Sequence, residues 1–189
     1  FNPDTNPGAN ISEDGEGNKV LSFDSGQQTV FTELQSFVVP DGTTRSAFFQ
    51  MFLSNDGGGL QYHIGMSNKA LRGFTSDTDG DLGGFLVINR FDGDDTATIE
   101  LIDGTVADFE VESGIWYDVW IDVTNAPGGD LDKISAYIAP HGDPTFGVDR
   151  EELFKDAEGD RGNSIDLVFF FVAAKAGNTG DNEFLVDNV

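Results

Sequence analysis

The side chains best suited to binding chemistry alternate along one stretch past the middle of the chain, residues 115–123. Successive side chains of a β-strand point to opposite faces. One face would be apolar or aromatic: Ile115, Tyr117, Val119, Ile121 and Val123. The other would alternate tryptophan and aspartate: Trp116, Asp118, Trp120 and Asp122. An indole can stack on a sugar ring while carboxylates accept hydrogen bonds from its hydroxyls. We therefore predict a carbohydrate-binding face with Trp120 and Asp118, whereas Trp116, which begins the strand, can instead pack under a loop.

Polar and aromatic residues elsewhere could extend this face, provided that their strands lie in the same sheet. The relevant runs are 46–53, 60–66 and 84–91. The hydrogen-bonding groups that they would add are Gln50, Gln61, His63 and Arg90. The aromatic platforms are Tyr62, Phe91 and Tyr137. Each residue also has a purely structural alternative, because strand register does not follow from sequence alone.

A calcium loop is predicted at Asp77-Thr-Asp79-Gly-Asp81, where three carboxylates alternate around a turning glycine. Calcium prefers such oxygen ligands. The loop is not an EF-hand, because Ile88 stands at the twelfth position and no helices flank it. A plain acidic turn is the alternative. Weaker candidates of the same kind are Asp92, Asp94 and Asp95, and Asn125 with Asp130 and Asp132.

The charge of the chain limits its partners. There are 34 acidic and 10 basic residues, so the formal net charge is −24. Nucleic acids require clustered cations and anionic membranes attract basic segments, which excludes both. A neutral glycan is favoured over a polyanionic one, unless calcium bridges the charges. No apolar run approaches the roughly 20 residues needed for membrane insertion. The chain has no cysteine, which excludes disulfides, a thiol nucleophile and thiolate metal sites.

The elements that must position these residues are almost all strands. Runs rich in Val, Ile, Phe and Tyr, separated by Gly, Asp and Asn clusters, predict an antiparallel β-sandwich of about 11 strands. These runs are 20–24, 28–38, 46–54, 60–66, 84–91, 97–102, 105–112, 116–124, 132–139, 164–173 and 183–188. One short helix is predicted over 149–158, with Asp149 as N-cap, Glu152 at the capping-box position and Gly159 as the stop.

The strands differ in their faces. Residues 46–53 and 166–173 are apolar on both faces, which predicts interior strands. Residues 105–112 alternate acidic and apolar side chains, which predicts one solvated face. Asp103-Gly104 separates the strand-like runs 98–102 and 105–109 by two residues, which predicts a type I′ hairpin.

Three short stretches carry a family resemblance: 17–23 (GNKVLSF), 114–125 (GIWYDVWIDVTN) and 184–189 (FLVDNV). They resemble the opening, central and closing strands of concanavalin A-like, laminin-G-like jelly rolls in secreted, multi-modular bacterial proteins. The resemblance implies a jelly-roll fold. It also implies a structural calcium between the first and last strands, held by Asp187 with Glu13 or Asp24, although Asp187 could simply cap its strand. The fold hosts lectins, glycan-binding modules, hydrolases and lyases alike.

Two enzymatic alternatives use the same fold. Gln61 and His63, with Arg45 and Tyr137, are similar to the catalytic set of jelly-roll alginate lyases, which implies a uronate neutralised by Arg45 and Gln61 and protons exchanged by His63 and Tyr137. Arg45 lies close to Gln61 in sequence, Ser46-Ala47 replaces the expected acidic continuation, and the acidic surface would repel a polyuronate. A glycoside hydrolase would need paired carboxyls, but the nearest match, 108–112, has the wrong order and is equally a solvated face.

We therefore expect residues 1–189 to form one domain, with 1–10 as a loose lead-in. The chain opens at Phe1 without a signal peptide and reads as a trimmed piece, a module of a larger secreted, cell-surface or extracellular bacterial protein whose other modules are its partners. Its predicted function is to bind an extracellular, neutral polysaccharide without cleaving it. The alternatives are a lyase or hydrolase of the same fold and a calcium-dependent adhesive or structural module.

Overall fold

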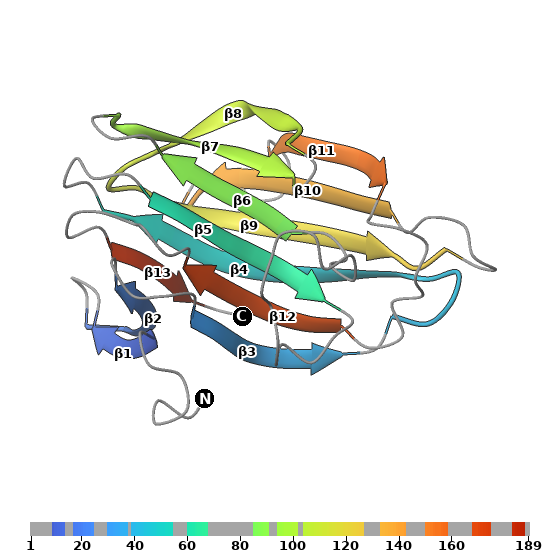
Figure 1. The fold of residues 1–189 in the computed structure, drawn as a ribbon, viewed down its shortest axis with the longest axis horizontal. Coiled ribbons are helices and arrows are strands. Elements are labelled where there is room, and N and C mark those ends of the chain that lie inside the picture. Colours follow the sequence, from blue (N-terminus) through green and yellow to red (C-terminus); the bar gives the residue numbers. More distant parts are fainter. Residues whose placement is uncertain are drawn as a thin grey trace.

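A computed structural model describes most of the chain as two antiparallel β-sheets that pack as a sandwich (Figure 1). The residues that the structure describes are 9–13, 17–24, 30–37, 39–54, 60–67, 85–90, 94–101, 104–126, 133–142, 150–158, 168–174 and 183–187. Within this part of the chain, no helix is long and apolar enough to cross a membrane.

The seven-stranded sheet has the order β1-β2-β13-β4-β9-β10-β11. Its strands are β1 Ala9–Glu13, β2 Lys19–Asp24, β13 Glu183–Asp187, β4 Thr44–Leu53, β9 Trp116–Thr124, β10 Lys133–Pro140 and β11 Glu151–Glu158. The pairing of β2 with β13 joins the first and last parts of the chain. Strand β4 lies in the interior of the sheet, as its two apolar faces predict.

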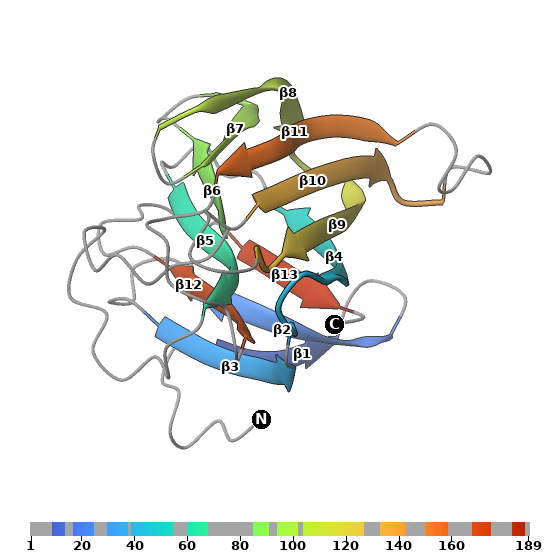
Figure 2. The same ribbon diagram turned by 90° about the vertical axis from the view of Figure 1, so that its right-hand side faces the viewer.

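The six-stranded sheet has the order β3-β12-β5-β6-β7-β8. Its strands are β3 Val30–Phe37, β12 Val168–Ala174, β5 Leu60–Ser67, β6 Phe85–Arg90, β7 Thr96–Leu101 and β8 Val106–Glu112. Strand β12 is also interior, as predicted. Figure 2 shows the sheets as two layers, with β8 and β11 against each other where the sheet edges meet.

The core lies between the sheets and follows the predicted alternation. On β9 the odd-numbered side chains from Tyr117 to Val123 are buried in it. On β8 the alternation is also confirmed, because Ala107 and Val111 are buried while the acidic positions are exposed. Tyr62 of β5 is fully buried and stacks on Phe184 of β13, with ring centroids 4.5 Å apart. Tyr62 is therefore a core residue, and its predicted role as a sugar platform is wrong.

Two segments differ from the sequence prediction. The helix expected over 149–158 is wrong, because residues 151–158 form β11, which pairs with β10. The capping signals are local, whereas this pairing buries the adjacent Leu153 and Phe154, and β-bulges accommodate them near Asp156, whose φ is 46°. Likewise Ala9 and Asn10, expected in a loose lead-in, belong to β1, which covers the edge of β2.

The hairpin between β7 and β8 is confirmed, but its turn differs from the predicted one. The amide of Gly104 donates to the carbonyl of Leu101 (2.9 Å), and the amide of Leu101 donates to the carbonyl of Thr105 (2.8 Å). The connection is thus one residue longer than a two-residue turn. Gly104 has φ of 87°, as expected for the glycine that closes a three-residue hairpin loop.

Candidate functional site

The predicted binding face is the side of the seven-stranded sheet that points away from the core, at β4, β9 and β10. We call it the outer face. Cross-strand pairing arranges its side chains in rows. The first row is aromatic: Phe48, Trp120 and Tyr137. The second row is Gln50, Asp118 and Ala139. The third row is again aromatic: Phe52 and Trp116. A polar row therefore lies between two aromatic ones.

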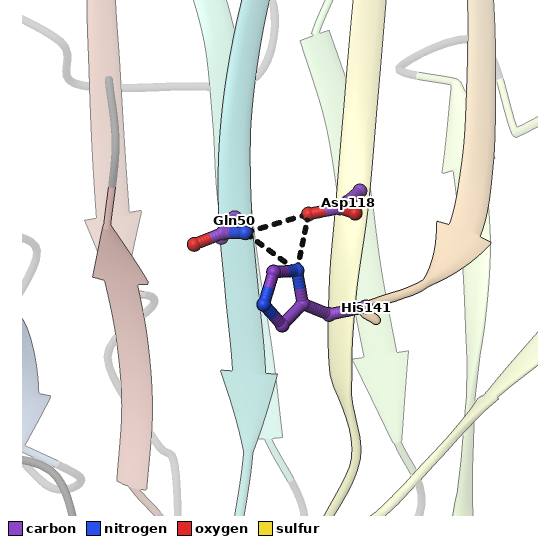
Figure 3. Close-up of polar contacts among 3 residues, drawn as sticks. All are labelled: Gln50, Asp118 and His141. Carbon is purple, nitrogen blue, oxygen red and sulfur yellow. Dashed lines mark hydrogen bonds and ion pairs between the residues drawn. The ribbon is translucent and has the colours of Figure 1, made fainter. Parts of the chain in front are cut away.

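Three polar side chains meet at the centre of this face (Figure 3). Gln50 Nε2 donates to Asp118 Oδ1 at 2.7 Å, and Asp118 Oδ1 lies 2.9 Å from His141 Nδ1. The Gln50 Nε2 and His141 Nδ1 atoms are 2.6 Å apart. His141 follows β10 in the next turn, and its backbone amide donates to the carbonyl of Trp116 (2.7 Å). The three residues therefore converge from β4, β9 and the end of β10.

The burial of this polar cluster is uneven. Asp118 is fully buried although it points away from the core, and Gln50 is 8% exposed. The His141 side chain is 49% exposed. The second carboxylate oxygen of Asp118, Oδ2, is buried and has no hydrogen-bond partner among the described residues. A buried carboxylate requires hydrogen-bond donors or a positive charge. Gln50 and His141 therefore stabilise the buried Asp118 side chain.

Aromatic pairs flank the polar cluster on both sides. Phe48 and Trp120 have ring centroids 5.3 Å apart and tilted by 47°, and Phe52 and Trp116 are 5.4 Å apart and tilted by 36°. All four rings are neither buried nor fully exposed. Such rings keep part of their surface accessible while their packing fixes their orientation, as a stacking platform requires.

A cation covers part of the first aromatic row. The guanidinium carbon of Arg150, just before β11, lies 4.0 Å from the ring centroid of Tyr137 and 5.6 Å from that of Trp120. Both distances fit cation–π contacts. Beyond this row, Ser46 Oγ donates to Asp122 Oδ1 at 2.5 Å. The outer face therefore offers aromatic surface, amide and hydroxyl groups, and a single cation adjoining Trp120 and Tyr137 among its described residues.

The structure brings together four of the predicted binding residues and separates the others. Gln50, Asp118, Trp120 and Tyr137 share the outer face. Gln61, His63 and Arg90 lie on β5 and β6, in the six-stranded sheet. The condition that 46–53 shares a sheet with 60–66 and 84–91 is therefore not met, since the chain crosses to the other sheet after β4. The same crossing separates Arg45 and Tyr137 from Gln61 and His63, the four residues of the lyase alternative.

The predicted calcium ligands have no site in the described part of the structure. Asp77, Asp79 and Asp81 lie outside the described residues, as does Asp92. Asp187 ends β13 opposite Gln50, whereas Asp24 pairs with Glu183 at the other end of that strand. Among the described residues, no three His, Cys, Asp or Glu side chains are grouped to hold a metal ion. Because Asp187 pairs with Gln50, it lies beside the outer face.

Sequence reasoning missed two members of the face, His141 and Arg150. Both lie beside strands rather than within them, so strand alternation does not indicate their orientation. The only sequence signal is that His141 follows the predicted strand 132–139 in a Pro-His-Gly turn. Gly142 has φ of 81° there, a conformation that glycine adopts readily.

Tyr117 links the inner side of β9 to the other sheet. Its hydroxyl accepts a hydrogen bond from the backbone amide of Glu112 at the end of β8 (3.0 Å). Burial raises the pKa of Tyr117 above its ordinary value of 10.0, the hydrogen bond from Glu112 lowers it, and the charge of Glu112 raises it. Tyr117 therefore remains neutral and supports the scaffold beneath the outer face.

No protein-family model and no curated protein sequence matches the chain. Among solved structures, the chain is similar to an alginate lyase in complex with an alginate trisaccharide, with 14% identity, a TM-score of 0.44, and 96% of this chain and 82% of that chain covered. It is also similar to the SPRY domain of human HERC1, with 12% identity, a TM-score of 0.46, and coverage of 99% and 97%. Similarity at this level assigns no activity to the chain.

Proposed function

We propose that the outer face of β4, β9 and β10 binds an extracellular polysaccharide without cleaving it. The observation that carries this proposal is the polar cluster of Gln50, Asp118 and His141 between two rows of half-buried aromatic rings. Sugars present flat C–H faces and rims of hydroxyls, so their binding sites combine aromatic platforms with fixed polar groups.

The spacing of the two tryptophans favours a chain over a single sugar. Trp116 and Trp120 are four positions apart on β9, which corresponds to about 13 Å along an extended strand. This separation exceeds the width of one pyranose ring. The two indoles would therefore contact different residues of an extended polysaccharide that runs along β9, across the polar row.

Charge favours a neutral polysaccharide. The protein carries a net charge of −24, and Asp122 and Asp187 lie on or beside the outer face. Such a surface repels sulfated and uronic acid polymers. Arg150 is engaged with the rings of Tyr137 and Trp120, so it does not offset this repulsion for a polyanion as a cluster of cations would.

The arrangement of the carboxylates supports binding rather than hydrolysis. Retaining glycosidases place two accessible carboxyls about 5 to 5.5 Å apart. Asp118 is fully buried and Asp122 is hydrogen-bonded to Ser46. A fully buried carboxylate does not reach a glycosidic oxygen, so on this face Asp118 serves to position its neighbours.

We extend the proposal to calcium at Asp77, Asp79 and Asp81, as a structural ion of a secreted module. A calcium ion that binds the folded state and not the unfolded state stabilises the protein and raises its melting temperature, by an amount that grows with the logarithm of the ratio of calcium concentration to dissociation constant. We expect chelation to lower the melting temperature and Asp79→Asn to abolish that response. An unchanged melting temperature in chelator would overturn the calcium proposal and leave the outer face untouched.

The test is affinity electrophoresis against neutral and acidic polysaccharides, with assays for released products. We expect retardation by at least one neutral polymer and no depolymerisation. Trp120→Ala should weaken binding at least tenfold, because it removes a stacking platform worth about 1.5 kcal/mol. Val106→Ala is the matched control, since Val106 is an exposed apolar residue on β8. Retardation by no glycan, or equal retardation of the Trp120→Ala variant, would overturn the proposal, and product release would overturn its non-catalytic part.

A further inference from the structure

His141 is the polar residue of the cluster that is open to a ligand. Its backbone is fixed by the hydrogen bond to Trp116, and its ring is fixed on one side by Asp118 and Gln50. In Figure 3 the Nδ1 atom faces these two residues and the second ring nitrogen, Nε2, lies on the side of the ring away from Asp118. In the described part of the chain, Nε2 has no hydrogen-bond partner, and the side chain is 49% exposed.

The hydrogen atoms of the cluster can be assigned by donor and acceptor capacity. An ionised Asp118 only accepts hydrogen bonds, and the amide nitrogen of Gln50 only donates. If Nδ1 carried no hydrogen, Gln50 could donate to Nδ1. The lone pair of Nδ1 would then also face the Asp118 carboxylate oxygen, which is 2.9 Å away. If Nδ1 carries the hydrogen, both His141 and Gln50 donate to Asp118 Oδ1.

The second assignment is the favourable one. Hydrogen bonds to an ionised group are roughly twice as strong as neutral ones, and Asp118 is fully buried, so water does not replace them. The short contact between Gln50 Nε2 and His141 Nδ1 (2.6 Å) then joins two donors that converge on one oxygen. This close approach of two donors is unfavourable, but a lone pair facing a buried carboxylate would be more so, because it would leave the charge less compensated.

We propose that Asp118 and Gln50 orient the His141 ring with Nδ1–H toward Asp118, so that the Nε2 atom on the other side of the ring forms a hydrogen bond with a hydroxyl of the bound sugar. This inference rests on the proposed function and adds the chemistry by which the site selects its ligand. His141 is the residue that contacts the ligand, and Asp118 and Gln50 are positioning residues. A sugar that lacks the hydroxyl at this point leaves Nε2 without a partner and binds more weakly.

The tautomer can be measured without any ligand. The chain has two histidines, His63 and His141, so nitrogen-15 NMR of the wild-type protein and of His63→Gln assigns both rings. For the ligand-free protein we expect a hydrogen on Nδ1 of His141, directed at Asp118. Asp118→Asn should shift the population toward the Nε2–H tautomer. An Nε2–H tautomer in the wild-type protein would overturn the inference, whatever the outcome of glycan binding.

Ligand contact is tested with cellohexaose, laminarihexaose and mannohexaose as neutral probes. We expect His141→Ala to weaken binding of the hexasaccharide that the protein retains by about tenfold, the loss of one good hydrogen bond. His141→Gln, which can place an amide group near the Nε2 position, should recover part of the affinity that His141→Ala loses. His141→Asn, which mimics the Nδ1 side, should recover any stability that His141→Ala loses but not the affinity. The Nε2 resonance should shift when the hexasaccharide binds.

The outcomes separate the two proposals. Binding that depends on Trp120 but leaves the His141 Nε2 resonance and the affinity of His141→Ala unchanged would overturn this inference and leave the proposed function standing. Failure of all polysaccharides and hexasaccharides to bind would overturn the proposed function and, with it, the ligand contact of His141. The ligand-free tautomer would then still decide whether Asp118 orients the ring.

Discussion

The outer sides of β8 and β9 look alike in sequence and differ in structure. Both strands alternate an inward apolar side with an outward side that carries acids. On β8 the outward residues Val106, Asp108, Glu110 and Glu112 are all exposed. On β9 the outward residues Trp116, Asp118, Trp120 and Asp122 are half-buried or buried. Solvated acids therefore cover one strand, and a packed mixture of aromatic and polar groups covers the other.

The difference in burial distinguishes a candidate binding face from a solvent-exposed face. On β8 the carboxylates are exposed, and Glu110 also accepts a hydrogen bond from Thr96 of β7 (2.9 Å), so these acids are not desolvated. On β9 the acid at the centre is covered by Gln50 and His141 and flanked by aromatic pairs. Desolvated polar groups must be paired, and their partners come from three strands or strand ends.

The largest expected effect concerns Asp118 compared with Asp108. Asp118→Ala should lower the free energy of unfolding by about 2 kcal/mol, because the buried amide of Gln50 and the ring of His141 lose their acceptor. Asp108→Ala should change it by less than about 0.5 kcal/mol, as is usual for exposed positions. Urea unfolding of the two variants at one pH measures both values. Equal values would contradict the distinction between the two strands.

A smaller effect is expected at Tyr117, which connects β9 to the end of β8. Tyr117→Phe should cost about 1 kcal/mol, since the Glu112 amide loses its acceptor. Burial raises the pKa of Tyr117 in the folded protein, so the unfolded chain ionises first. Its contribution is complete below pH about 10 and is lost as pH rises through the folded pKa.

The alkaline limb of the stability profile tests this assignment. The wild-type protein should lose more stability between pH 9 and pH 11, in a series of thermal melts at about half-unit steps, than Tyr117→Phe does. Identical pH dependence in the two proteins would show that the Tyr117 hydroxyl is not desolvated. The other two tyrosines remain in both proteins, so the difference reports on Tyr117 alone.

The smallest effect is expected at Arg150. Arg150→Ala removes the cation from the rings of Tyr137 and Trp120 and should cost about 0.5 kcal/mol, as for an exposed cation–π contact. Lys155→Ala on β11 is the control: its ion pair with Glu152 is 3.6 Å long and both side chains are exposed, so the expected cost is near zero. A larger loss at Lys155 than at Arg150 would contradict the role of the cation at the aromatic row.

The sequence predicted the strands and the alternation of β9 well, because the alternation of apolar and polar residues can be recognised within each short segment. Each predicted run corresponds to a strand, and Trp120, Asp118, Gln50 and Tyr137 do share a face. The error over 149–158 arose because helix caps are also local, whereas β11 exists through its pairing with β10. Sequence did not show that Gln61, His63 and Arg90 lie on the other sheet, since sheet membership depends on crossovers between distant segments. His141 was missed because it lies in a turn.

Intrinsic fluorescence reports on the outer face itself, because the chain has two tryptophans, Trp116 and Trp120, and both lie on this face. Titration with the neutral hexasaccharide that the protein retains should change tryptophan emission saturably, with the dissociation constant found by calorimetry. Trp120→Phe should reduce the change while Val106→Ala leaves it intact. Binding detected by calorimetry with no change in emission would place the site elsewhere and contradict binding at the outer face.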